Sequence, residues 1–222
     1  PIKRAVELFG ILNIVCFSPE DLSIIKNGPA ERRRFMDMEL SQLDKIYLSN
    51  LINYNKVVNQ RNKLLKELSF KSSEEKLETL DIWDLQLVKY GTEVMKRRVG
   101  FVQELNEIIG GLHEKLSGGT EKLTIEYQPC VEETTFLDTV TKMRERDLRM
   151  KSTCFGPHKD DLIFFINGSE VKKYGSQGQQ RTAALSLKLA EIELVKKVVK
   201  DTPVLLLDDV LSELDSNRQQ FL

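Results

Sequence analysis

Two acidic residues follow an apolar run near the end of the chain. Asp208 and Asp209 come directly after Val204–Leu207. A buried strand that ends in paired acids is a common way to hold hydrated Mg²⁺ beside nucleotide phosphates, because Mg²⁺ keeps most of its waters and takes one or two carboxylates. On this interpretation Asp208 binds the metal and Asp209 lies near the attacking water. A strand whose polar end simply meets solvent gives the same pattern, so this segment alone leaves both interpretations open.

A glycine-containing loop opens an apolar helical pattern that runs from about residue 177 to 200. The loop holds Gly175, Ser176, Gln177, Gly178 and Gln179. Glycine lets the backbone approach a ligand closely. Ser176 is suited to cap the helix, and the helix N-terminus offers N–H groups and a positive dipole end to an anion. An ordinary capped loop explains the segment equally well by itself, but the acid pair that follows 32 residues after Ser176 favours a nucleotide-phosphate site.

Apolar residues spaced by threes and fours mark two long helical segments in the first half of the chain. The first runs from about 29 to 70, and the second follows Glu74 and ends among the glycines of 110–119. Such spacing forms a seam of the coiled-coil kind, and the short polar loop between the segments predicts an antiparallel hairpin. Trp83 lies at a seam position, so we expect it in the core of this arm rather than in a base-stacking platform.

Shorter elements surround the two long helices. Ser18 and Pro19 predict a helix start after a short buried strand that ends near Phe17. Beyond residue 120 we expect a strand over 123–127, a helix over 134–150, a strand over 161–166 with a turn at Asn167-Gly168, and a parallel-sheet strand over 204–207 that is buried on both faces.

The composition is that of an ordinary globular protein. The 222 residues hold 33 Lys and Arg against 34 Asp and Glu, and 41% of them are hydrophobic. This excludes a disordered chain, and no apolar run approaches the roughly 18 residues that span a membrane. Three scattered cysteines make no disulfide framework, which favours a cytoplasmic protein. Cys154 and His158 have the spacing of half a zinc site, but the other cysteines show no paired spacing; for His158 a structural role in a turn is favoured over catalysis.

Positive charge is concentrated in residues 26–71. Ten Lys and Arg stand there against five Asp and Glu, and the densest group is Arg32, Arg33 and Arg34. A solvated helix face explains this surplus, and so does a surface that contacts the phosphate backbone of DNA. On the second interpretation the three arginines are candidate DNA-binding residues.

Several of these segments resemble one family. The stretch from Gly175 to Leu194 resembles the signature segment of the RecF family of bacterial DNA replication and repair ATPases, and Leu205 to Asp215 resembles its Walker B strand and D-loop. Four shorter stretches match too, so the resemblance covers nearly the whole chain: 17–22, 32–35, 54–62 and 156–161. It implies a mixed α/β fold that is mostly helical, with part of an SMC-like ABC-type ATPase head (1–17 and 120–222) and an inserted helical arm (18–119).

The resemblance also implies roles and partners. Asp208 corresponds to the Walker B metal carboxylate, Asp209 to the catalytic acid and Asp215 to the D-loop. Ser176, Gln177, Gly178 and Gln179 correspond to the signature that acts in trans on ATP held by the other subunit of an ATP-dependent homodimer. ATP and Mg²⁺ are the implied cofactors of the whole protein. DNA, single- and double-stranded, and the RecR and RecO proteins are the implied partners, with loading at gaps and junctions.

One part of an ATPase has no counterpart in the sequence. A phosphate loop needs Gly-x-x-x-x-Gly-Lys-Ser/Thr, and none of the twelve glycines is followed by Lys. The family pattern places this loop before residue 1, so we expect a piece of a longer protein that is inactive as an ATPase by itself. The rival hypothesis is a non-catalytic coiled-coil interaction module in which the acid pair is vestigial.

Overall fold

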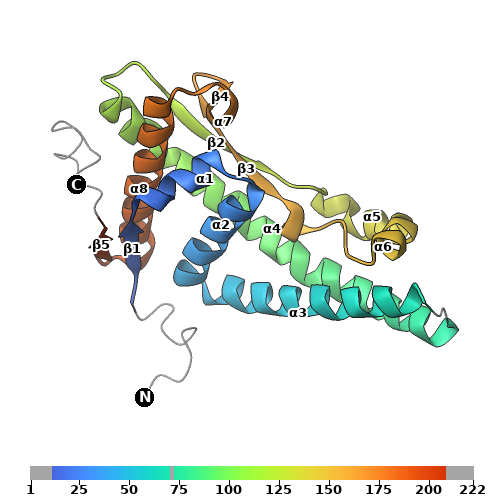
Figure 1. Cartoon of the computed structure of the whole chain (residues 1–222). Helices are drawn as coiled ribbons and strands as arrows, with labels where there is room; N and C mark the ends of the chain where they lie inside the picture. Colours follow the sequence, from blue (N-terminus) through green and yellow to red (C-terminus); the bar gives the residue numbers. More distant parts are fainter. Residues whose placement is uncertain (1–11, 71–72, 209–222) are drawn as a thin grey trace. The chain divides into compact units, whose positions relative to one another are not determined.

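The computed structural model describes residues 12–70 and 73–208, which form a mixed α/β fold with mostly helical structure, as predicted (Figure 1). The residues group into two compact units. The first holds 1–45, 100–127 and 162–222, and the second holds 46–99 and 128–161. The division into a head (1–17 and 120–222) and an arm (18–119) that the resemblance implies stays a prediction.

The first unit contains the segments that carry the candidate site. Its strand β1 (Ile14–Phe17) leads through a 3-10 turn over Pro19–Asp21 into helices α1 (Leu22–Lys26) and α2 (Pro29–Leu43). The predicted start at Ser18 is present, since its backbone N–H donates to Asp21 Oδ2 at 2.9 Å. The later elements are β2 (Leu123–Gln128), β3 (Asp161–Ile166), β4 (Ser169–Glu170), α7 (Val171–Tyr174), α8 (Gln177–Val199) and β5 (Val204–Leu207).

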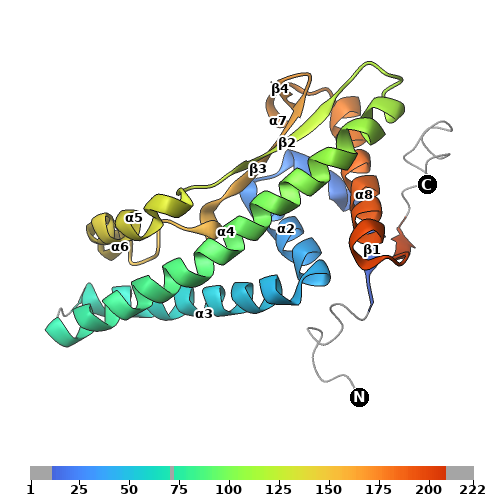
Figure 2. The ribbon, with the colours of Figure 1, turned by 180° about the vertical axis from the view of Figure 1, so that it is seen from behind.

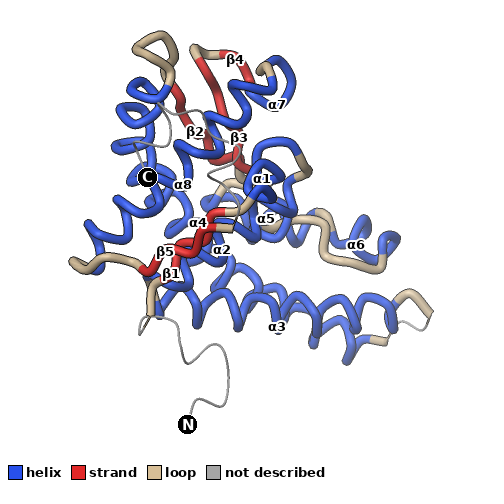
Figure 3. The backbone as a smooth tube through the Cα atoms, turned by 60° about the vertical axis from the view of Figure 1, so that its left-hand side comes forward, coloured by secondary structure: helices blue, strands red, loops and turns tan. Residues whose placement is uncertain are grey.

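Strands β1 and β5 form a two-stranded parallel sheet (Figure 3). Ile14 pairs with Val204, and Phe17 pairs with Leu207. The parallel strand predicted at 204–207 is therefore present, but its expected burial is wrong, because the four side chains are 37–50% exposed. Among the described residues β5 has β1 as its one neighbouring strand.

The core of the first unit lies between β1 and α8. Val15 and Phe17 point to the buried side of β1 and pack against apolar side chains of α8 and against Leu116. The α8 members of this cluster are Leu185, Leu189, Ile192 and Val195. Their spacing of three and four places them on one helical face, so the packing fixes how α8 lies along β1.

A second sheet of the described residues has the strand order β2-β3-β4. Strands β3 and β4 pair antiparallel across the predicted Asn167-Gly168 turn, where both residues have positive φ, 50° and 79°. Asn and Gly are the residues that adopt this left-handed conformation most readily, and two such residues in succession form the tight hairpin turn.

The second unit is built on a helical hairpin, which confirms the predicted antiparallel pair (Figure 2). Helix α3 (Lys45–Leu68) packs against the first part of α4 (Glu74–Leu116), and the end of α4 belongs to the first unit. Near the tip, Leu64, Leu65 and Leu68 form a cluster with Leu80, and Trp83 packs against it as expected of an arm core residue.

Two helices predicted as continuous are each broken once. The pattern over 29–70 divides at Asp44, which has extended backbone (φ −142°, ψ 104°) and ends α2 before α3 begins. Asp disfavours helix interiors because its side chain competes for backbone hydrogen bonds. The pattern over 134–150 divides at Met143 into α5 (Phe136–Lys142) and α6 (Arg144–Met150).

A buried ion cluster ties α6 to the hairpin. Arg61 is fully buried; its Nε lies 2.6 Å from Asp84 Oδ1, and another guanidinium nitrogen lies 2.6 Å from Asp147 Oδ2. Thr153 accepts a further hydrogen bond from Arg61 at 3.0 Å. Removing one partner of such a buried pair costs about 3–5 kcal/mol, because the other charge stays buried without compensation.

Candidate functional site

Ser176 occupies the N-cap of α8, as the sequence predicts. Its Oγ accepts a hydrogen bond from the Gln179 backbone N–H at 3.2 Å, and Gln179 Oε1 accepts one from the Ser176 backbone N–H at 2.8 Å. This reciprocal capping box holds the first turn of the helix. Ser176, Gln177 and Gly178 are exposed, so the positive end of the helix dipole faces solvent and is available to an anion.

The two glycines of the loop differ in their surroundings. A Cβ added at Gly175 would lie 2.5 Å from the backbone oxygen of Val171, so only glycine fits at this bend. At Gly178 the nearest neighbour of an added Cβ is Ser176 Oγ at 3.8 Å, which leaves open space beside the first turn. Gly175 is therefore required by the fold, whereas Gly178 keeps the approach to the helix N-terminus unobstructed.

The side chain of Gln179 is held by a polar network that the sequence did not predict. Gln179 Nε2 donates to Glu121 Oε1 at 2.8 Å, and the other oxygen of Glu121 lies 3.2 Å from Nε2 of the buried His113. His113 Nδ1 lies 2.8 Å from Ser186 Oγ, which donates its own proton to the Thr182 carbonyl at 2.7 Å.

Both ring nitrogens of the buried His113 therefore contact polar side chains, Ser186 on one side and Glu121 on the other. The resulting chain of contacts positions the side chain of Gln179 at the exposed loop.

Asp208 follows β5 directly and is exposed. Its backbone N–H donates to the Phe17 carbonyl at 2.9 Å, which extends the pairing of β5 with β1 by one residue. Residues that follow parallel strands share the carboxyl edge of the sheet, where ligands of open α/β sheets bind. Asp208 therefore lies at this edge of the sheet, and its role as a metal carboxylate stays a prediction. The candidates Asp209 and Asp215 lie outside the described residues.

The three candidate DNA-binding arginines lie on α2 in different environments. Arg32 is 3% exposed, and its guanidinium donates to the carbonyls of Ile24 at 3.3 Å and Asn27 at 2.8 Å. It therefore joins α1 to α2, and the expectation that it faces DNA is corrected. Arg33 is half-buried and Arg34 is exposed, and both line a shallow groove with Asp37.

His158 has the structural role that the sequence favoured. Its Nδ1 lies 2.6 Å from the Tyr54 hydroxyl and its Nε2 lies 2.9 Å from the Thr153 carbonyl. Burial raises the pKa of Tyr54 well above its ordinary value, so Tyr54 donates to Nδ1 and His158 Nε2 donates to Thr153. Within residues 12–70 and 73–208, no group of three or more His, Cys, Asp or Glu side chains is arranged to hold a metal ion.

Comparisons with known proteins give one result. The chain is 68% identical to the DNA replication and repair protein RecF of Lachnospira eligens and 61% identical to that of Agathobacter rectalis, in each case over all 222 residues. The RecF of Halalkalibacterium halodurans is 46% identical over 99% of the chain. The chain spans 61% of the length of the first two relatives.

Solved structures agree with the sequence relatives. Two structures of the recombination mediator protein RecF in the RecFOR pathway, one titled with ATP and one with an ATP analogue, superpose with TM-scores of 0.90 and 0.89. They are 39% and 40% identical to the chain, cover 99% and 98% of it, and are themselves covered to 60%. No protein-family model matches the chain, and its described helices are all too short or too polar to cross a bilayer.

Identity of this level over the whole of this chain, together with the shared fold, shows to which family the chain belongs. The chain belongs to the RecF family, and it corresponds to about three fifths of the family proteins that it matches.

Proposed function

We propose that this chain supplies the signature loop and the metal carboxylate of an ABC-type ATPase that acts in recombinational DNA repair. The observation that carries the proposal is that one unit holds both the exposed, serine-capped N-terminus of α8 and Asp208. Asp208 lies at the edge of the parallel pair β1–β5. The relatives are named as DNA replication and repair proteins, and the similar solved structures are titled with ATP or its analogue, which supports a nucleotide as the ligand.

Each part of the site has a distinct role in the proposal. The first turn of α8 contacts the γ-phosphate of ATP that a second subunit holds, so ATP joins two copies of the protein. Asp208 fits Mg²⁺, because an exposed carboxylate at a strand edge is the oxygen ligand that this ion takes. When bound, Mg²⁺ neutralises charge on the phosphates. Asp209 orients or deprotonates the attacking water, and Asp215 contributes the D-loop.

The first prediction concerns the chain by itself. Because its sequence has no phosphate loop, the 222-residue chain should bind Mg·ATP weakly and should not hydrolyse it. Isothermal titration calorimetry with Mg·ATP should give no saturable heat, while a full-length RecF protein that carries this segment binds. Micromolar affinity of the chain for Mg·ATP, about 8 kcal/mol of binding free energy, would contradict the proposal that ATP binding needs a phosphate loop outside these 222 residues.

The same titration separates the proposal from its rival. A non-catalytic coiled-coil module with a vestigial acid pair predicts that the full-length protein also fails to bind Mg·ATP. The ATPase proposal predicts saturable binding by the full-length protein and slow turnover, since Asp at position 209 is shorter than the Glu of most ABC ATPases and has less reach.

We further propose that DNA, RecR and RecO are partners of the full-length protein. The pathway named for the similar structures supports these partners, and the surplus of positive charge in 26–71 supports contact with phosphates. Since Arg32 is used inside the protein, we assign the contact to Arg33 and Arg34 on α2. A cytoplasmic location and loading at gaps or junctions belong to the same proposal.

The second prediction tests the DNA surface. Changing Arg33 and Arg34 to Ala in the full-length protein should weaken DNA binding equally for all sequences, and the slope of log affinity against log salt should flatten by about one unit for each lost contact. Fluorescence anisotropy over a salt series measures both. The exposed Lys142, which lies outside the basic segment, is the control: Lys142→Ala should change neither quantity. An unchanged slope in the double variant would show that Arg33 and Arg34 face solvent and do not contact DNA.

A further inference from the structure

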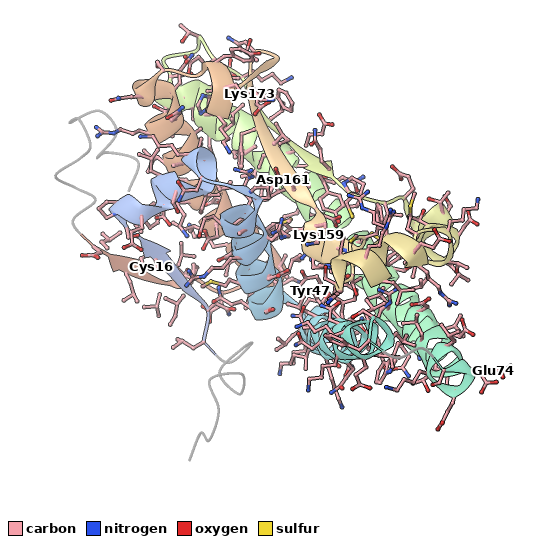
Figure 4. All side chains as sticks on the ribbon, turned by 45° about the vertical axis from the view of Figure 1, so that its right-hand side comes forward. Cys16, Tyr47, Glu74, Lys159, Asp161 and Lys173 are labelled. Atoms are coloured by element: carbon pink, nitrogen blue, oxygen red, sulfur yellow. The ribbon has the colours of Figure 1, made fainter. Side chains whose placement is uncertain are left out.

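The loop between α7 and α8 contains a glutamine whose two polar side-chain atoms both have partners within this chain. The loop follows α7, on which Lys173 is labelled in Figure 4. Gln179 Oε1 accepts a hydrogen bond from the Ser176 backbone N–H, and Gln179 Nε2 donates to Glu121 Oε1, both at 2.8 Å. The first of these contacts closes the capping box, and the second ties the box to a residue outside α8.

The carboxyl group that holds Gln179 is itself fixed by neighbouring groups. Glu121 Oε2 lies 3.2 Å from Nε2 of His113, whose side chain is fully buried. His113 Nδ1 lies 2.8 Å from Oγ of the buried Ser186 on α8. The backbone N–H of Glu121 also donates to Ser117 Oγ at 3.3 Å. Glu121 therefore connects a fixed point in the core of the first unit to the exposed turn.

The capping box leaves the Ser176 hydroxyl ready for an anion. Ser176 Oγ accepts a hydrogen bond from the Gln179 backbone N–H at 3.2 Å, so the oxygen is held while its proton remains available to a phosphate. At an exposed helix end a capping box is a weak restraint, because an unheld glutamine side chain samples several rotamers. A hydrogen bond to a carboxylate is stronger than one between neutral groups, so Glu121 keeps Gln179 in the rotamer that closes the box.

We propose that Glu121 is a positioning residue for the signature loop. Through Gln179 it sets the orientation in which the Ser176 hydroxyl and the N–H groups of the first turn meet the γ-phosphate. This inference rests on the proposed function of the α8 N-terminus. Glu121 does not contact the nucleotide and acts through Gln179, so its removal makes the dimer pay for ordering the loop when it closes on ATP.

Hydrogen exchange of the ATP-free, full-length protein measures the loop without reference to its function. Glu121→Ala should speed exchange of the loop peptide that holds the Ser176 and Gln179 N–H groups by about tenfold or more, because the box then opens more often. Glu121→Gln should restore slow exchange, since its amide oxygen still accepts from Gln179 Nε2 and its amide nitrogen faces His113. Glu126→Ala, at an exposed glutamate of β2, is the matched control and should leave exchange unchanged.

Light scattering with ATP measures the consequence for the dimer. Glu121→Ala should raise the dimer dissociation constant by about tenfold or more while each subunit still binds ATP, and Glu121→Gln should dimerise nearly like the parent protein. A general loss of stability would instead reduce ATP binding along with dimerisation. Glu126→Ala should again match the parent protein.

A second variant removes the same contact from its other end. Gln179→Met keeps the length of the side chain without its polar atoms, so it should speed loop exchange and weaken the dimer as Glu121→Ala does. Because Glu121 acts through Gln179, adding Glu121→Ala to Gln179→Met should cause no further loss of dimerisation.

Three results would each overturn the role of Glu121: unchanged loop exchange in Glu121→Ala, normal dimerisation of that variant, or additive losses in the double variant. Ser176→Arg, measured in parallel, separates this failure from failure of the proposed function. If Ser176→Arg abolishes dimerisation and Glu121→Ala leaves it normal, the proposed function stands and the role of Glu121 is wrong. If Ser176→Arg also dimerises normally, the proposed function is wrong, and the role of Glu121 in dimerisation is wrong with it.

Discussion

Replacing Ser176 by Arg in the full-length protein should abolish ATP-dependent dimerisation while ATP binding by each subunit stays nearly normal. Ser176 is exposed at the cap of α8, so a larger side chain is accommodated without disturbing the core. The guanidinium would then occupy the space through which the helix N-terminus approaches the γ-phosphate. The dimer dissociation constant should rise by about 100-fold or more, equivalent to about 2.8 kcal/mol.

Light scattering with and without ATP measures this effect, and nucleotide titration of the same samples checks that binding is retained. Ser69→Arg is the matched control, because Ser69 is exposed beyond the end of α3 and the substitution adds the same charge and bulk. The control should dimerise like the parent protein. Normal dimerisation of the Ser176 variant would show that α8 does not take part in the contact.

Replacing Asp209 by Asn should have the opposite effect on the dimer. The amide cannot accept a proton from the attacking water, and it removes one negative charge near the phosphates. ATP turnover should fall by a factor of about 10² to 10⁴, while the ATP-bound dimer forms and persists. Phosphate release gives the rate, and light scattering over time gives the lifetime of the dimer.

The control for this change is Asp201→Asn, since Asp201 is exposed just before β5 and accepts a hydrogen bond from the Thr202 backbone. It should leave turnover unchanged. Turnover at the parental rate in the Asp209 variant would remove Asp209 from the catalytic step. It would also leave Asp208 as the one acid of this pair with an assigned role.

The sequence predicted features that depend on a few neighbouring residues. The Ser176 cap needs only the Ser–Gln pair three residues apart, and the Asn167-Gly168 turn needs only two residues that tolerate positive φ. The hairpin of α3 and α4 follows from the spacing of the apolar residues, and the strand at 204–207 follows from a continuous apolar run. Such local signals also located most elements, whereas the fold class was implied by the family resemblance.

Features that depend on distant residues were not predictable in this way. The burial of Arg32 follows from its hydrogen bonds to backbone carbonyls around α1, which the arginine spacing does not reveal. The exposure of the β5 side chains depends on what packs on the sheet, and the apolar run does not show that. The network behind Gln179 joins residues 58 positions apart, Glu121 and Gln179, and no spacing rule connects them. Its one visible sign is a lone histidine, His113, at a buried face of α4.

The network behind Gln179 gives His113 a defined part in the proposed mechanism. Because His113 and Glu121 fix the side chain of Gln179, they hold the capping box that shapes the exposed turn of α8. A signature loop that is already ordered before ATP arrives loses less conformational entropy when the dimer closes. The same residues also link the end of α4 to α8 within the first unit.

We propose that the N-terminus of α8 contacts ATP held by another subunit, and the most direct test of this contact combines Ser176→Arg with Asp209→Asn. The Asp209→Asn protein with ATP provides a long-lived dimer whose mass light scattering measures with little background. Adding Ser176→Arg to this protein should return the mass to that of a monomer while ATP binding is retained, and adding Ser69→Arg should leave the dimer intact. A dimer that persists with ATP in the Ser176→Arg/Asp209→Asn protein would contradict the account.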